Sequence, residues 1–217
     1  SENDGSPMTV VAAIMVKALY RALPKNKLPL RIETNHNYRA EVGCPKTHHD
    51  LLSHIFLLVP HHALEWPIDR ICTVLRGSTF LQSEPEYAYE TLRRFYDYTD
   101  IVHGDKGLKN KNKYASKYSH RVPDVHNSVL INYVGREDWG TMTEYVERVH
   151  IITDAHLLFE ISDVGDNFCI SLMQMNRKTK YINCFCQILK EENIPYKMHG
   201  VFNNHLPISK VESAPIA

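Results

Sequence analysis

The chain has 217 residues, of which 43% are hydrophobic and 23% are charged, with 25 basic against 25 acidic side chains. This length suits one large domain or two small ones, and the apolar content excludes a wholly disordered chain. No apolar run is long enough for a membrane span. The five cysteines are odd in number and widely spaced, which argues against a disulfide framework and predicts a reducing compartment, the cytoplasm or the nucleus.

The first half of the chain predicts helices around one hairpin. Apolar residues recur every three or four positions over residues 8–24, which predicts an amphipathic helix. Two short extended runs, 28–33 and 38–43, flank Thr34-Asn35-His36-Asn37, and asparagines favour the tight turn of a β-hairpin. Three further helices are expected, over residues 47–60, 67–77 and 85–98.

The end of this half is expected to pass from a helix into a strand and a basic loop. The residues concerned are Leu92-Arg93-Arg94-Phe95-Tyr96-Asp97-Tyr98-Thr99-Asp100-Ile101-Val102-His103-Gly104-Asp105, with the strand at 100–103. This order resembles the winged-helix domains of RNA-associated proteins, the LOTUS type in particular, with Lys106–Lys113 as the wing. The resemblance implies binding to RNA or to a partner protein.

The second half predicts the element order β-α-β-β-α-β. Strands are expected at 129–134, 157–161, 168–173 and 196–202, and helices at 141–149, opened by a Thr-x-x-Glu capping box, and 181–192. The order resembles the RNA-recognition motif, in which aromatics of the central strands stack on bases. Leu130-Ile131-Asn132-Tyr133-Val134-Gly135 matches its first strand motif loosely, with Tyr133 as the candidate stacking residue. Phe168-Cys169-Ile170-Ser171-Leu172-Met173 lacks the basic, glycine and paired aromatic pattern, so protein binding is the alternative.

The predicted fold class is therefore α+β, with two modules. Residues 1–110 form a helical, winged-helix-like module with an N-terminal helix and hairpin, and 111–127 form a basic linker. Residues 128–203 form a βαββαβ module of ferredoxin-like or RRM-like topology, and 204–217 form a tail.

The strongest functional signal is a basic segment from Lys106 to Arg121. It carries six basic side chains, two tyrosines and no acid in a chain whose formal net charge is zero. Such a segment suits phosphate contact with base stacking, although a solvated linker would have the same composition. The predicted nucleic-acid-binding residues are Arg93, Arg94, Lys106, Lys109, Lys111, Lys113, Tyr114, Lys117, Tyr118 and Arg121.

Metal and enzyme signatures are incomplete. Cys44-x-x-x-His48 offers one half of a zinc site near His49, His54, His61 and His62, but no second half follows. Pro123-Asp124 resembles the start of a metal-dependent nuclease motif, without the later acid-x-Lys. Further acids and histidines could hold Mg²⁺ or Mn²⁺: Asp154, Glu160, Asp163, Asp166, His150 and His156. We expect no cofactor and no resident metal.

The sequence thus favours a non-enzymatic adaptor in RNA metabolism. The basic segment would contact nucleic acid, RNA rather than DNA, and residues 128–203 would dock a protein partner; no membrane association is expected. Two alternatives remain open: a protein-interaction scaffold that binds no nucleic acid, and a divalent-metal-dependent nuclease.

Overall fold

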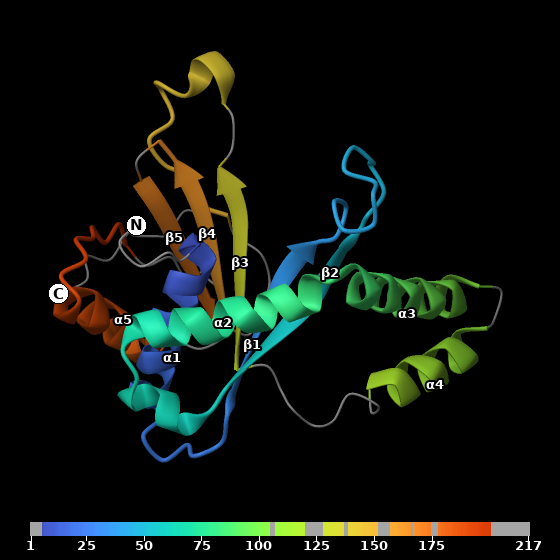
Figure 1. The fold of residues 1–217 in the computed structure, drawn as a ribbon, viewed down its shortest axis with the longest axis horizontal. Coiled ribbons are helices and arrows are strands. Elements are labelled where there is room, and N and C mark those ends of the chain that lie inside the picture. Colours follow the sequence, from blue (N-terminus) through green and yellow to red (C-terminus); the bar gives the residue numbers. More distant parts are fainter. Residues whose placement is uncertain are drawn as a thin grey trace, which may run out of the picture.

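The protein folds around a five-stranded mixed β-sheet, as seen in a computed structural model (Figure 1). The structure describes residues 6–104, 107–119, 128–136, 139–151, 157–165, 167–174 and 178–200. The helices are α1 (Pro7–Ala22), α2 (Ile68–Ser83), α3 (Pro85–His103), α4 (Leu108–Ser119) and α5 (Lys180–Glu191), with 3-10 turns η1 (His61–Glu65) and η2 (Gly140–Met142). The strands are β1 (Leu30–Asn37), β2 (Leu52–Val59), β3 (Val129–Arg136), β4 (Leu157–Val164) and β5 (Asn167–Gln174). The predicted α+β class is confirmed.

Strand order in the sheet is β2-β1-β3-β4-β5. The outer pairs, β1 with β2 and β4 with β5, are antiparallel, whereas β3 is parallel to both of its neighbours. The β1–β3 ladder is short, joining Ile32 to Val129 and Glu33 to Leu130. Beyond it the two parts of the sheet diverge, with β1 and β2 turning away from β3, β4 and β5 (Figure 1).

One face of the sheet, the helix face, is covered by α1, α2 and α5. The core there joins Ile32, Ile131 and Phe159 of the sheet to residues of all three helices. Helix α1 is the most deeply buried, with no exposed surface at Ala12, Ala13, Met15 and others of its apolar residues. Its helicity is therefore sustained by tertiary burial, as is usual for helices of this length in water.

The Tyr20 hydroxyl ties α1 to the edge of the sheet. It donates to the carbonyl oxygen of Val59 at 2.9 Å and accepts the N–H of Leu30 at 3.2 Å. The phenol thereby satisfies a backbone carbonyl group at the end of β2 and a backbone N–H group at the start of β1. Burial raises the pKa of this phenol, so it remains a neutral donor at physiological pH.

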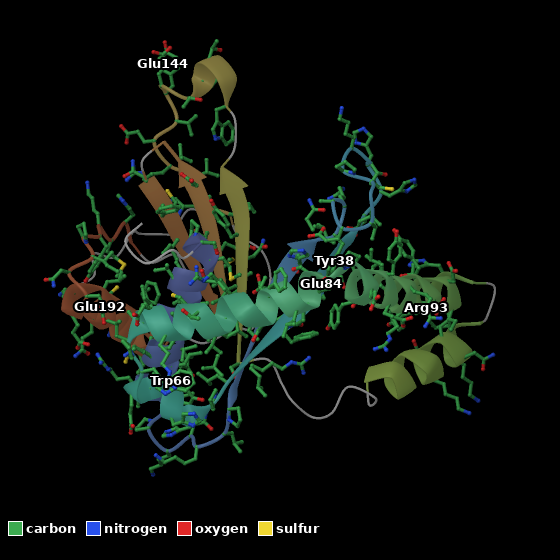
Figure 2. All side chains as sticks on the ribbon, viewed as in Figure 1. Tyr38, Trp66, Glu84, Arg93, Glu144 and Glu192 are labelled. Carbon is green, nitrogen blue, oxygen red and sulfur yellow. The ribbon has the colours of Figure 1, made fainter. Side chains whose placement is uncertain are left out.

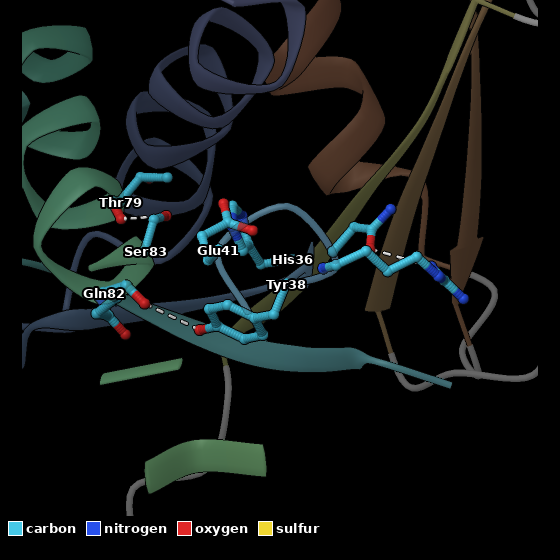
Figure 3. Close-up of polar contacts among 8 residues, drawn as sticks. His36, Tyr38, Glu41, Thr79, Gln82 and Ser83 are labelled. Atoms are coloured by element: carbon cyan, nitrogen blue, oxygen red, sulfur yellow. Dashed lines mark hydrogen bonds and ion pairs between the residues drawn. The ribbon is translucent and has the colours of Figure 1, made fainter. Parts of the chain in front are cut away.

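The outer edge of β2 is protected by a side chain of α2. The Gln82 amide accepts the N–H of Phe56 at 3.0 Å and donates to its carbonyl oxygen at 2.9 Å, as a neighbouring strand would. The main-chain carbonyl oxygen of Gln82 in turn accepts a hydrogen bond from the Tyr38 hydroxyl at 3.0 Å (Figure 3). The two bonds between Gln82 and Phe56 block further strand pairing at Phe56.

The connection between β3 and β4 is called the crossover here, and residues 139–151 of it are described. Because β3 and β4 are parallel neighbours, it must return the chain to the opposite end of the sheet. It does so over the face away from the helices, where the Ser162 hydroxyl donates to the carbonyl oxygen of Val149. We call this the crossover face.

Several predicted elements of the first half are wrong. The hairpin around Thr34–Asn37 is absent, because β1 runs straight through these residues and pairs with β2. The predicted helix 47–60 is instead strand β2, in which Ile55, Leu57 and Val59 alternate toward the helices. Phe56 and Leu58 on the other side of the strand are also apolar, so the apolar residues of this segment have a spacing that also fits a helix.

The predicted strand 100–103 and wing Lys106–Lys113 are also wrong. Helix α3 continues to His103 and ends where the N–H of Gly104 bonds to the carbonyl oxygen of Asp100. Most of the predicted wing lies in helix α4. The helix–strand–wing order that carried the winged-helix resemblance is therefore not what these residues form.

The second half was predicted better. The strands β3, β4 and β5 and the helix α5 lie where the sequence placed them. The helix expected at 141–149 is wrong, because this stretch holds only the short turn η2 and irregular chain, without the capping box. Residues 196–200 are not a strand, and residues from 201 onward lie outside the described part. Among the helices described, none combines the length and apolar character needed to cross a membrane.

Candidate functional site

Helices α3 and α4 form an arm beside the sheet (Figure 1). The N-terminal half of α3 anchors it, because Ala88 and Leu92 pack in a small core with Tyr38 and Ile55. The rest of α3 and all of α4 extend beyond β2, away from the layers of the main core (Figure 1).

The predicted basic segment falls largely on α4, which contains no acidic residue. Lys109 and Lys113 are exposed and one helical turn apart, and position 117 follows at the same spacing. Lys111 is half-buried. Positions 114 and 118, the two predicted stacking tyrosines, are also one turn apart in α4.

The structure does not describe every predicted contact residue. Lys106 and Arg121 lie outside the described residues, as do the side chains of Tyr114, Lys117 and Tyr118. Among the predicted lysines, the described basic surface therefore consists of Lys109, Lys111 and Lys113.

Arg93 and Arg94 differ from these lysines. Both lie on α3 within the arm and pair with Glu90, at 2.8 Å from Arg93 Nη2 and 3.9 Å from Arg94 Nε (Figure 2 labels Arg93). Helix α3 also carries Glu86, Asp97 and Asp100. The two arginines are thus partly neutralised, and the uncompensated positive charge of the arm belongs to α4.

A second polar feature crosses the other face of the sheet. Side chains alternate along a strand, so the neighbours of the core residues Ile131 and Phe159 point to the crossover face. Strand register then aligns one polar residue from each strand, which we call the polar row: His54, Asn35, Asn132, Glu160 and Ser171.

Hydrogen bonds link the polar row into a chain. The Asn35 amide donates to Asn132 Oδ1 at 3.4 Å, and Asn132 Nδ2 donates to Glu160 Oε2 at 2.8 Å. The first of these bonds joins β1 to β3 where their backbone ladder has ended. At the β5 end, Ser171 Oγ lies 3.0 Å from Nδ1 of His150 in the crossover.

Glu160 is the most buried member of the row, with 5% of its surface exposed. Burial raises the pKa of its carboxyl group, and the hydrogen bond from Asn132 only partly offsets this. A carboxyl group placed in this way retains its proton to higher pH than an exposed one, so it can serve as a hydrogen-bond donor or a proton store.

At the exposed end of the row, His54 pairs with an acid. His54 Nδ1 lies 2.9 Å from Glu33 Oε1, and this hydrogen bond raises the pKa of His54. On the same surface the Arg31 guanidinium lies 3.8 Å from the ring centre of Phe56. The row thus runs from a charged, exposed end to a buried carboxyl group.

The structure separates the predicted metal ligands. His54 pairs with Glu33, while His61 contacts Tyr20 and His62 contacts Trp66. Among the residues described, no three His, Cys, Asp or Glu side chains are placed to hold a metal ion. The nuclease candidates Asp124, Asp154, His156 and Asp166 lie outside the described residues.

Two other predicted site residues point to the helix face. Asp163 is three residues from Glu160 on β4, so the two carboxylates project to opposite faces of the sheet. Tyr133, the candidate base-stacking residue, packs against the helix-side core.

Sequence reasoning missed the polar row. It named His54 and Glu160 only as candidate metal ligands, because Asn132 is a lone amide in β3 and Glu160 shares β4 with Ser162 and Asp163. Comparison of the chain with protein-family models gives no match, and comparison with curated proteins gives none either. Function must therefore be argued from the basic helix and the polar row.

Proposed function

We propose that this chain binds single-stranded nucleic acid, with RNA as the first candidate, through helix α4, and that residues 128–203 dock a protein partner. The observation that carries the proposal is the arrangement of α4: lysines at turn-to-turn spacing, without an acid, on an arm held away from the sheet. A phosphate backbone is the polyanion that such a surface fits.

The chemistry predicts affinity dominated by charge, with weak sequence preference. Lysine contacts a phosphate as a point charge and does not read base edges. Arg93 and Arg94 would contribute less, because Glu90 competes for them. The proposal rests on α4 itself and no longer on the winged-helix resemblance.

The compartment is part of the proposal. All five cysteines are unpaired. Unpaired thiols support a reducing environment, so we propose the cytoplasm or the nucleus as the location.

The decisive experiment is a fluorescence-anisotropy titration of a labelled single-stranded oligoribonucleotide at two salt concentrations. If four phosphates are neutralised, the affinity should fall about 50-fold between 50 and 200 mM salt, from a slope of about −0.7 per phosphate. Changing Lys109, Lys111, Lys113 and Lys117 to Gln should abolish this binding. Circular dichroism and urea denaturation of this variant should show that its fold is retained, so that a loss of binding reports on charge.

A matched variant controls for net charge. Lys25, Lys27, Lys46 and Lys180 are exposed lysines outside the arm, and changing all four to Gln removes the same charge. This variant should bind like the wild type. Equal loss in both variants would show general attraction rather than a site on α4, and no binding at low salt would leave the scaffold alternative. Cleavage of the labelled RNA on addition of Mg²⁺ would instead support the nuclease alternative.

A further inference from the structure

Four basic side chains meet where the crossover and residues 192–200 lie over β5. We call them the cationic cluster: Arg148, His150, Lys197 and His199. Arg148 Nη1 lies 2.8 Å from Nδ1 and 3.0 Å from Nε2 of His199. The ring centres of His150 and His199 are 6.4 Å apart. Residues 51 positions apart in the chain are thus brought into direct contact.

The cluster has no acidic partner among the contacts described. Loss of hydration and then the positive charges of Arg148, Lys197 and His150 lower the pKa of His199, and no acid among the described residues opposes this shift. Glu144 and Glu147 belong to the same crossover, but no described hydrogen bond or ion pair joins them to the cluster. Figure 2 places Glu144 at the far tip of the crossover.

A hydroxyl group completes the arrangement. Ser171 Oγ of β5 lies 3.0 Å from His150 Nδ1, so the cluster continues directly into the polar row. The side chains offer guanidinium, ammonium, imidazole and hydroxyl donors from three separate segments. Arg148 and Lys197 carry like charges, and a bound anion would offset their repulsion.

We propose that the cationic cluster is a binding site for a phosphate group, separate from helix α4. Arg148 would bind two phosphate oxygens with its planar fork of donors, and Lys197 would add a point charge. The Ser171 hydroxyl and His150 would supply the remaining hydrogen bonds. His199, a hydrogen-bond partner of Arg148 in the free protein, would take up a proton and turn to the anion.

This mechanism links binding to pH. The charged groups that face His199 are Arg148 and His150 of the crossover and Lys197 of its own segment. A bound anion offsets all three, so the pKa of His199 should rise on binding. Affinity should therefore increase as the pH falls, until His199 is protonated in the free protein as well.

The test is a titration with inorganic phosphate, followed through the imidazole C–H resonances of the histidines by NMR. We expect a saturable shift of His150 and His199 and a higher pKa of His199 at saturation. Arg148→Gln should weaken binding at least about tenfold, because the loss of one charge-assisted hydrogen bond has that effect and the guanidinium would make two. Lys197→Gln should weaken it less. A parallel titration with sulfate, whose charge is constant in this pH range, separates protonation of the protein from that of the ligand.

The control is Lys46→Gln, which removes an exposed cation outside both the arm and the cluster and should leave phosphate binding unchanged. A shift that never saturates, or that Lys46→Gln weakens as much as Arg148→Gln does, would overturn the proposal. A short oligoribonucleotide distinguishes the two sources of phosphate. If it moves the His150 and His199 resonances, the site takes a nucleic-acid backbone. If inorganic phosphate alone moves them, the site takes a small phosphate. Because these variants leave α4 intact, failure here is distinct from failure of the RNA-binding test.

Discussion

Phe159 and Glu160 are neighbours on β4 and are buried to nearly the same degree, with 0% and 5% of their surfaces exposed. Phe159 points to the helix face and packs against Phe185, with the ring centres 5.2 Å apart. Glu160 points to the crossover face and accepts a hydrogen bond from Asn132. Helices cover one face with apolar side chains, whereas an irregular crossover covers the other and leaves a line of polar groups beneath it. Burial thus supports apolar packing on one face, whereas on the other it raises the pKa of a carboxyl group.

The largest expected effect is on the helix face. Phe159→Ala should lower the free energy of unfolding by about 3–5 kcal/mol, because it removes a large side chain and leaves a cavity. Urea denaturation followed by circular dichroism measures this loss. A cost below about 1 kcal/mol would mean that the helix face is not the tightly packed core described here.

A smaller and pH-dependent effect is expected at the adjacent position. Folding raises the pKa of Glu160 above its ordinary value of 4.5, so the folded state holds this proton more tightly than the unfolded state. The contribution of Glu160 to stability is therefore complete below that value and is lost as the pH rises through the folded pKa. Glu160→Gln, which keeps an acceptor for Asn132, should gain stability relative to the wild type as the pH rises.

The measurement is urea denaturation of both proteins at several pH values between 4 and 8. The difference in unfolding free energy should change steadily in favour of Glu160→Gln across this range. A difference that stays constant with pH would show that Glu160 titrates normally, and the chemical distinction between the two faces would then disappear.

The smallest effect is expected where the crossover face is open. Leu58 on β2 has 58% of its surface exposed and lies on the same face as His54. Leu58→Thr introduces a β-branched residue that suits a strand at an exposed position, so the free energy of unfolding should change by less than about 0.5 kcal/mol. The same denaturation assay checks this. A loss comparable to that of Phe159→Ala would mean that a further layer covers β2.

Local patterns predicted elements whose periodicity is clear or whose ends are marked. Helix α5 has a single apolar stripe, and β4 and β5 are joined at Gly165, which has a positive φ of 60°. Patterns failed where both sides of an element are apolar, as in β2. They also failed at residues 100–103, whose β-branched Ile101 and Val102 suggested a strand although α3 continues through them.

The site was harder to predict for a different reason. The lysines of α4 are contiguous in sequence, so composition alone found them. Asn35 and Asn132 are 97 residues apart, and only the parallel pairing of β1 with β3 aligns them. Arg148 and His199 come together only through the crossover. Local periodicity carries no information about strand register over such separations.

The short β1–β3 ladder has a consequence for the order of folding. The antiparallel β1–β2 pair and α1 are complete once synthesis has passed Val59, but Ser128, which bonds to Arg31 in β1, lies 97 residues downstream of Arg31. At ribosomal rates this interval lasts roughly 5 to 20 seconds, during which the inner edge of β1 has no neighbouring strand. Long-range parallel pairing is also intrinsically slow. The nascent protein therefore passes through a stage in which β1, an interior strand of the finished sheet, has an open edge, and α2 and the arm are synthesised while that edge is open.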